Sequence, residues 1–313
     1  SKYSVSKKQI KSEVVKCGKN PVYFINNYAK IIHPVKGLVP FKTYPFQSQL
    51  LEEFSNHRYN VILKARQLGI STITAAYVLW MMMFSRNKNI LVIATKQETA
   101  KNLVTKVRVM HSNLPSWLKN HCIEDNKLSL RYKNGSQIKA TSATADAGRS
   151  EALSLLILDE AAFIPKVDDI WTASQQTLAT GGRAVVLSTP NGVGNFFHKT
   201  WVEAEDGINS FNFIRLPWNL HPERDQGWRD QQDELLGPSM AAQECDCDFI
   251  TSGQNVVDGK ILQWYMETFV QEPVEKRGID NNLWIWEHPD FNKQYVLSAD
   301  VGRGDGEDYS AFH

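Results

Sequence analysis

Residues 64–72 read Lys-Ala-Arg-Gln-Leu-Gly-Ile-Ser-Thr, which fits the nucleotide-binding pattern G-x-x-x-x-G-K-[ST] except at its lysine. In that pattern, backbone N–H groups surround the phosphates, the lysine contacts the β and γ oxygens, and the hydroxyl binds Mg²⁺. Gly69 takes the second glycine position and Ser71 the hydroxyl position. Ile70 replaces the lysine, while Lys64 stands at the first glycine, from where its long side chain can reach the same phosphates. This segment predicts a phosphate loop that binds ATP with Mg²⁺.

A second segment supplies two carboxylates. Residues 153–160 read Leu-Ser-Leu-Leu-Ile-Leu-Asp-Glu, an apolar run typical of a fully buried parallel strand. The run ends in Asp159 and Glu160, at the strand end where α/β sheets place their chemistry. Asp159 is then suited to holding Mg²⁺, and Glu160 to polarising the attacking water. The alternative is a buried strand that ends in a solvated acidic turn, and the phosphate loop upstream favours the nucleotide interpretation.

The composition is that of an ordinary globular chain. The 313 residues are 42% hydrophobic and 22% charged, and the formal net charge is +1. The length favours two domains, or one large domain with an appendage. Because the net charge is close to zero, any contact with DNA must come from a local patch. The four cysteines lack the spacing of a zinc site, so we expect free thiols. We recognise no signal peptide and no segment that would cross a bilayer, and we expect no membrane partner.

Strands and helices alternate along most of the chain. The predicted strands cover 61–65, 90–95, 153–158 and 184–188. The predicted helices cover 46–57, a stretch from Ser71, 97–112 and a stretch through Trp171. Asn134-Gly135, between apolar runs at 128–132 and 137–141, predicts a β-hairpin. We expect residues 33–45 to be a proline-rich connector. The alternation predicts an α/β fold with a doubly wound, mostly parallel sheet.

Two further segments offer contacts to a nucleotide. Phe46-Gln47 precedes the phosphate loop by about one helix and one strand. Glutamine can form a two-point hydrogen bond with an adenine edge, and phenylalanine can stack on the ring, although a surface glutamine in a helix is the plainer alternative. Ser188-Thr189-Pro190 closes the strand that follows the acidic one. A hydroxyl there can sense the γ-phosphate through water, and a simple strand-ending turn explains the segment equally well.

Two arginines are candidates for acting on the transition state. Arg66 lies inside the phosphate loop and can act within its own subunit, so either Arg66 or Lys64 can be the main phosphate cation. Arg149 lies in the loop 146–150, immediately before the acidic strand. Such a loop can project a guanidinium into the nucleotide of a neighbouring subunit. A surface arginine is the alternative, and the residues alone favour it.

Together these residues resemble the large terminase subunit of tailed bacteriophages, from about Val22 to the end of the chain. The segments that carry the resemblance are Phe46-Gln47, Lys64–Thr72, Leu155–Glu160, Ala161 with Phe163-Ile164-Pro165, and Ser188-Thr189-Pro190-Asn191-Gly192. Members of that family are ATP-driven DNA-packaging motors with an N-terminal ATPase of the P-loop (RecA/ASCE-like) type and a C-terminal nuclease of the RNase H type. The resemblance implies a nucleotide site formed by Phe46, Gln47, Lys64, Ala65, Arg66, Gln67, Leu68, Gly69, Ile70, Ser71 and Thr72.

The resemblance also implies individual roles. Gln47 reads adenine, Asp159 and Ser71 hold Mg²⁺, and Glu160 activates water. Residues 188–190 couple hydrolysis to DNA movement, and Arg149 becomes a finger that acts on a neighbouring subunit.

The C-terminal part looks like the start of the nuclease. Tyr295-Val296-Leu297-Ser298-Ala299-Asp300-Val301-Gly302 is an apolar strand with an acidic residue near its end, and Asp300 would be the first metal ligand of a two-metal site. Asp305, Glu307 and Asp308 follow, but the sequence stops at His313 before the remaining acidic ligands of the family, so we expect a piece of a longer protein with an incomplete nuclease. The expected parts are an ATPase core at 1–210, a lid subdomain at 211–270, a linker at 271–293 and a nuclease start at 294–313.

The expected partners are double-stranded DNA, the portal protein and the small terminase subunit. We expect a monomer in solution, a ring when docked on the procapsid, and a location in the cytoplasm of the infected bacterium and transiently at the portal. The competing function is a helicase or remodelling ATPase similar to superfamily 2, which shares the glutamine, phosphate loop and Asp-Glu features. A second RecA-like core is needed for that function, and residues 211–313 are too short for one. A binding module with a degenerate nucleotide pocket, suggested by Ile70, is the non-enzymatic alternative.

Overall fold

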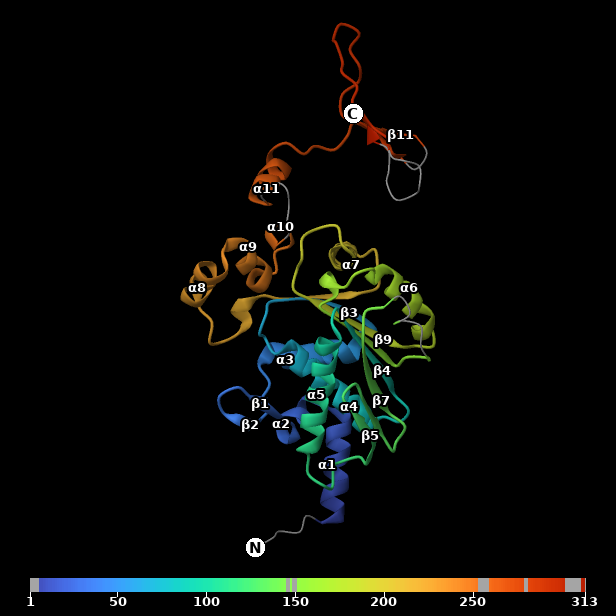
Figure 1. The fold of residues 1–313 in the computed structure, drawn as a ribbon, viewed down its shortest axis with the longest axis vertical. Coiled ribbons are helices and arrows are strands. Elements are labelled where there is room, and N and C mark those ends of the chain that lie inside the picture. Colours follow the sequence, from blue (N-terminus) through green and yellow to red (C-terminus); the bar gives the residue numbers. More distant parts are fainter. Residues whose placement is uncertain are drawn as a thin grey trace. The chain divides into compact units, whose positions relative to one another are not determined.

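The computed structural model describes residues 6–144, 147, 151–252, 259–278, 281–301 and 311–312 (Figure 1). Its centre is an eight-stranded sheet in the order β10-β3-β9-β8-β4-β7-β6-β5. The strands are β3 (Tyr59–Lys64), β4 (Asn89–Ala94), β5 (Cys122–Asn126), β6 (Ser129–Tyr132), β7 (Gln137–Ser142), β8 (Leu155–Asp159), β9 (Arg183–Ser188) and β10 (Asn212–Leu216). All neighbouring pairs from β10 to β7 are parallel, whereas β6 and β5 are antiparallel additions. The predicted mostly parallel sheet is therefore confirmed.

Helices cover both faces of this sheet, as expected of a doubly wound fold. The helices are α1 (Lys7–Lys19), α2 (Pro21–Tyr28), α3 (Pro45–Asn56), α4 (Ile70–Phe84), α5 (Gln97–Ser112), α6 (Val167–Leu178) and α7 (Phe196–Glu205). Side chains alternate across a strand, so Ile62 of β3 packs with α2 to α5 while Val61 and Leu63 pack with α6 and α7. The carboxyl ends of β3, β8 and β9 consequently meet at one edge, where Lys64, Asp159 and Ser188 lie.

The predicted hairpin at Asn134-Gly135 is confirmed, because β6 and β7 pair in an antiparallel manner around it. A second hairpin was not predicted. β1 (Lys30–His33) pairs with β2 (Gly37–Pro40). This hairpin begins just before the expected connector at residues 33–45 and continues into it. His33 supports the turn, since its Nδ1 accepts the N–H groups of Val35 and Lys36, each at 3.1 Å.

The expected lid boundary at residue 211 is wrong by several residues. Asn212–Leu216 form β10, which pairs in parallel with β3 and so belongs to the central sheet. The Leu216 carbonyl also accepts the N–H of Ala65 at 2.8 Å, which ties this strand to the start of the phosphate loop. After Pro217 the chain leaves the sheet and forms small helical elements. These are η2 (Trp218–Leu220), α8 (Gln226–Leu236), α9 (Pro238–Ala241), the π-helical turn η3 (Ala242–Asp246) and α10 (Phe249–Ser252). We call residues 217–252 the lid.

Residues 1–260 form one compact unit, and residues 261–313 form another. Most of α11 (Gly259–Thr268) falls in the second unit. There, the expected linker contains β11 (Glu275–Arg277) paired with β12 (Leu283–Ile285), so it is not free of regular structure. The strand expected at 295–302 shrinks to β13 (Ala299–Asp300), which pairs with β14 (Ala311–Phe312). Val296 and Leu297 are largely exposed, so their apolar pattern does not reflect burial. None of the described helices is long and apolar enough to span a bilayer.

Candidate nucleotide-binding site

The phosphate loop joins β3 to α4 at the carboxyl edge of the sheet. Lys64 ends β3 and α4 begins at Ile70, so the N–H groups of the first helical turn are available to an anion. Gly69 caps the helix in the left-handed region, with φ of +71°. A Cβ atom at Gly69 would lie 2.6 Å from Nε2 of Gln47. The backbone angle therefore favours glycine here, and a Cβ atom would also force the Gln47 amide to move.

Gln47 holds α3 to this loop. Its Nε2 donates to the Leu68 carbonyl at 3.0 Å, and its Oε1 accepts the N–H of Tyr44 at 3.0 Å. The side chain is only 3% exposed. One N–H group of Nε2 and one lone pair of Oε1 remain available for hydrogen bonds to adenine. Phe46 is buried with its ring stacked on Tyr44, at a centroid distance of 5.7 Å. Adenine recognition by Phe46 and Gln47 stays a prediction, and the partly exposed Tyr44 is an aromatic neighbour that the sequence did not single out.

Lys64, Ser71 and Asp159, three of the predicted site residues, come together at the carboxyl end of the parallel strands. Asp159 is 4% exposed, and its Oδ1 has no hydrogen-bond partner among the described residues. Burial raises the pKa of Asp159, while the nearby Lys64 ammonium and a hydrogen bond from the Ser71 hydroxyl lower it. A buried carboxylate oxygen without a donor, beside a hydroxyl, fits a hard cation such as Mg²⁺. The described residues contain no group of three or more His, Cys, Asp or Glu side chains that could hold a metal ion by themselves, so phosphate and water would complete the coordination.

Two cavities meet around these groups. One, of about 210 Å³, lies at the predicted phosphate loop, and we call it the phosphate pocket. It is lined by Lys64, Ala65, Gln67, Leu68, Gly69, Ile70, Ser71, Thr72 and Lys106. The other, of about 380 Å³, is lined by Asp159 and Glu160 together with side chains of β1, α4 and α5. Ser71, Thr72 and Lys106 line both cavities. The half-buried Glu160 follows β8 with φ of +56°, so the proposed base stands in the wall of the cavity that adjoins the phosphate pocket.

Ser188 is placed beside the acidic strand. Its side chain is fully buried, and its Oγ accepts the N–H of Ala162 at 3.1 Å. Asn191, which the sequence did not single out as a separate contact, donates to the Ala162 carbonyl at 3.2 Å. The end of β9 therefore contacts the backbone two residues after Glu160. The coupling role of Ser188, Thr189 and Pro190 stays a prediction.

The lid contacts the phosphate loop through side chains that sequence reasoning missed. Arg66 is paired with Glu244 at 3.0 Å, and its own N–H donates to the Glu244 carbonyl at 2.6 Å. Arg224 donates to the carbonyls of Arg66 and Gln67 at 3.1 and 2.9 Å, and its guanidinium lies 4.3 Å from the ring centroid of Trp228. No local motif marks Arg224 or Glu244, so the sequence carried no signal for these contacts.

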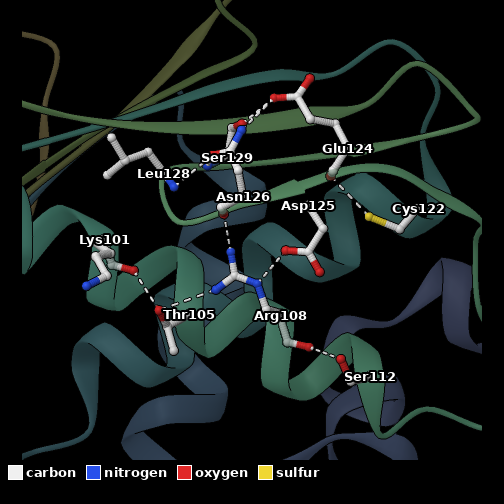
Figure 2. Close-up of polar contacts among 10 residues, drawn as sticks. All are labelled: Lys101, Thr105, Arg108, Ser112, Cys122, Glu124, Asp125, Asn126, Leu128 and Ser129. Atoms are coloured by element: carbon white, nitrogen blue, oxygen red, sulfur yellow. Dashed lines mark hydrogen bonds and ion pairs between the residues drawn. The ribbon is translucent and has the colours of Figure 1, made fainter.

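The remaining candidates lie elsewhere. Arg149 is outside the described residues, and Asp300 is an exposed residue of β13. Of the basic residues of α5, Lys101 pairs with Glu98, at 3.2 Å. Arg108 donates to Asp125 at 2.6 Å and to the Asn126 carbonyl, which fastens the β5–β6 hairpin to α5 (Figure 2). Arg108 therefore has a structural role.

The sheet and its phosphate loop define an α/β protein of the P-loop nucleotide-binding class. The chain belongs to the family described as terminase large subunit, T4likevirus-type, N-terminal, whose model matches residues 61–263. The large terminase subunits of Thermus phage G20c and Thermus virus P23-45 are each 29% identical to it over 182 residues. That match covers 52% of this chain and 34% of each relative. The chain thus spans about a third of the length of these curated relatives.

Solved structures show the same fold. The ATPase domain of the Thermus phage P74-26 large terminase has a TM-score of 0.54 at 22% identity, covering 67% of this chain and 95% of that one. The bacteriophage HK97 large terminase has a TM-score of 0.53 at 20% identity, covering 72% and 47%. The large terminase of another thermophilic bacteriophage, in complex with ADP, has a TM-score of 0.54 at 11% identity, covering 66% and 54%. The predicted fold class and the family resemblance are both confirmed.

Proposed function

We propose that this chain hydrolyses ATP and uses the energy to move double-stranded DNA into a viral procapsid. The observation that carries the proposal is the convergence of Lys64, Ser71 and Asp159 beside a cavity that Glu160 also lines. Family membership supports it, and so does the ADP complex of the terminase from a thermophilic bacteriophage. These are the groups that phosphoryl transfer requires: a cation and backbone donors for the phosphates, oxygen ligands for Mg²⁺, and a carboxylate that orients water.

Each residue then has a defined task. The loop N–H groups and Lys64 bind the phosphates. Ser71 and Asp159 would hold Mg²⁺, which would supply positive charge to the phosphates. Glu160 accepts a hydrogen bond from the attacking water and aligns it with the terminal phosphorus. Arg66 must leave Glu244 before its guanidinium can act on the same phosphates.

The wider role follows the family. We propose that the chain works with a portal protein and a small terminase subunit. It would be monomeric in solution, ringed on the procapsid, and located in the host cytoplasm and transiently at the portal. Asp300 would belong to the nuclease of the longer protein. A helicase or remodelling ATPase similar to superfamily 2 is the competing function.

The test is ATP hydrolysis measured with and without double-stranded DNA, in the wild-type chain and in Glu160→Gln. The motor function predicts turnover that rises with DNA and collapses in the variant, while ATP still binds, since Gln keeps the size of Glu160 and removes its charge. Strand separation of a duplex with single-stranded ends would instead indicate the helicase. A chain that binds ATP without any turnover would be a binding module.

A further inference from the structure

We infer that Lys106 of α5 is a second cation for the terminal phosphate of ATP and compensates for the lysine that Ile70 replaces. The inference rests on the proposed ATPase function and assigns a phosphate-binding residue outside the loop. In the sequence Lys106 is one of several basic residues on a helix, without any motif around it. Only the fold brings it to the nucleotide site.

Lys106 lies where the two cavities share their walls. Lys106 lines the phosphate pocket together with Lys64 and Gly69. It also lines the adjoining cavity together with Asp159 and Glu160. A side chain shared by both cavities lies between the loop that binds phosphates and the carboxylates that serve the metal and the attacking water. The terminal phosphate of ATP belongs in that position, because its phosphorus is the atom attacked.

Lys106 also has no partner for its charge among the described residues. Within the described residues it takes part in no hydrogen bond or ion pair, although its side chain is half-buried. The other basic side chains nearby on α5 have partners. Lys101 pairs with Glu98. Arg108 pairs with Asp125, as Figure 2 shows. The Lys106 ammonium is therefore available to an anionic ligand such as a terminal phosphate.

The site is also short of positive charge for the phosphates of ATP. In the usual P-loop, a lysine from the first turn of the helix contacts the β and γ phosphates. Here Ile70 takes its place, and this side chain is 3% exposed and brings no charge. Arg66 is held by Glu244, outside the residues that line either cavity. Lys64 is then the only loop cation that lines the phosphate pocket as the structure describes it. It faces Asp159 as well as the phosphates. Even with Mg²⁺ bound, one ammonium leaves a triphosphate beside two carboxylates with an excess of negative charge, which a second ammonium would reduce.

The test compares ATP with ADP, because only ATP has the terminal phosphate. Dissociation constants for ATPγS and for ADP, each with Mg²⁺, are measured by calorimetry on the wild-type chain, Lys106→Met and Lys106→Arg. Met keeps the apolar stem and removes the charge. We expect Lys106→Met to weaken ATPγS binding about tenfold, the loss of one charge-assisted contact, and ADP binding less than twofold. Lys106→Arg should recover most of the ATPγS affinity.

Lys101→Met, on the same helix but outside both cavities, is the matched control and should change neither constant. Unchanged thermal unfolding of the nucleotide-free variants shows that they fold. The inference is overturned if Lys106→Met binds ATPγS like the wild type, if it loses ATPγS and ADP equally, or if it loses only the stimulation by DNA, which would make Lys106 a DNA contact. A wild-type chain that binds no ATP at all would overturn the proposed function as well, and the two failures are therefore distinguishable.

Discussion

At the scale of single residues, the displaced lysine is the main departure from the usual phosphate loop. Lys64 is 9% exposed, lines the phosphate pocket and acts electrostatically on Asp159. We expect Lys64→Ala to lower the ATP turnover number at least about a hundredfold, or about 3 kcal/mol of barrier, with an unchanged circular dichroism spectrum. Steady-state hydrolysis measures this directly. Turnover like that of the wild type would assign the main phosphate contact to Arg66 instead.

Asp159 illustrates a conflict between stability and function. Because burial raises its pKa above the ordinary 3.8, the folded state holds the proton more tightly than the unfolded state. Its stabilising contribution is complete below the ordinary pKa and is lost as the pH rises through the raised pKa. At neutral pH without Mg²⁺, well above the ordinary pKa of the unfolded state, the raised pKa of Asp159 therefore costs stability. Asp159→Asn should raise the melting temperature by about 2–4 °C, the effect of about 1 kcal/mol in a domain of this size.

The same variant should lose the stabilisation that Mg²⁺ with ATP gives to the wild type, since a hard cation loses an anionic ligand. Melting curves at pH 4 to 8, with and without Mg²⁺ and ATP, test both statements. Glu52→Gln removes an exposed carboxylate of α3 and serves as the control. A nucleotide-free Asp159→Asn protein that is less stable than the wild type at neutral pH would show that the attraction to Lys64 outweighs the cost of burial.

At the scale of elements, α3 and the phosphate loop act as one unit through Gln47. Gly69→Ala forces a Cβ atom to within 2.6 Å of Gln47 Nε2, in addition to the left-handed φ of +71°. We expect the free energy of unfolding to fall by more than the roughly 1–2 kcal/mol that the backbone angle alone costs. Gly207→Ala is a matched control, because Gly207 has φ of +68° and open space around its Cβ position. Equal losses in the two variants, measured by urea unfolding, would mean that Gln47 moves away freely.

The lid acts on the loop through Arg66 and Glu244. If Arg66 acts on the phosphates, as proposed, its guanidinium has to leave Glu244, and the pair then competes with ATP. An ion pair with one exposed partner contributes about 0.2–1 kcal/mol, and Glu244→Gln should therefore tighten ATPγS binding up to about fivefold. Glu234→Gln, an exposed lid carboxylate, should leave the affinity unchanged. Weaker binding in Glu244→Gln would indicate that the pair holds the loop in its binding conformation.

Local patterns explain why some elements were predicted and others were not. The central strands β3, β4, β8 and β9 are continuous apolar runs because both of their faces are covered. The edge strand β10 has a half-exposed pattern, with Phe213 and Arg215 both exposed. Its partner β3 lies some 150 residues earlier in the sequence. Local periodicity cannot encode such a pairing, so the sequence alone predicts that this segment belongs to the lid.

At the scale of the whole molecule, the residues of the site also fall into those that the sequence predicted and those that it did not. The sequence identified Lys64, Ser71 and Asp159 because each sits at a fixed place in a motif or at a strand end. Arg224, Glu244 and Lys106 reach the loop from elements that only the tertiary fold brings near. The contributions of neighbouring subunits lie beyond a single chain and need an experiment on mixtures.

That experiment concerns Arg149. If it acts on the nucleotide of a neighbouring subunit, Arg149→Ala should leave the ATP affinity of the isolated chain within about twofold of the wild type, because a finger contributes chiefly to the transition state. The variant should, however, lose any rise in specific turnover with protein concentration. Hydrolysis measured over a range of protein concentrations, with DNA present, separates these two effects.

Mixing two inactive variants provides the decisive version. Arg149→Ala keeps the base Glu160, whereas Glu160→Gln keeps the finger, so an interface between the two variants contains one complete site. Under conditions where the wild type assembles, the mixture should hydrolyse ATP faster than either variant alone, and a mixture of Arg149→Ala with the double variant should not. If no activity is recovered while the wild type assembles and turns over, Arg149 does not act between subunits. It would then be an arginine that steadies the loop before β8, and catalysis would depend on the cations of a single chain.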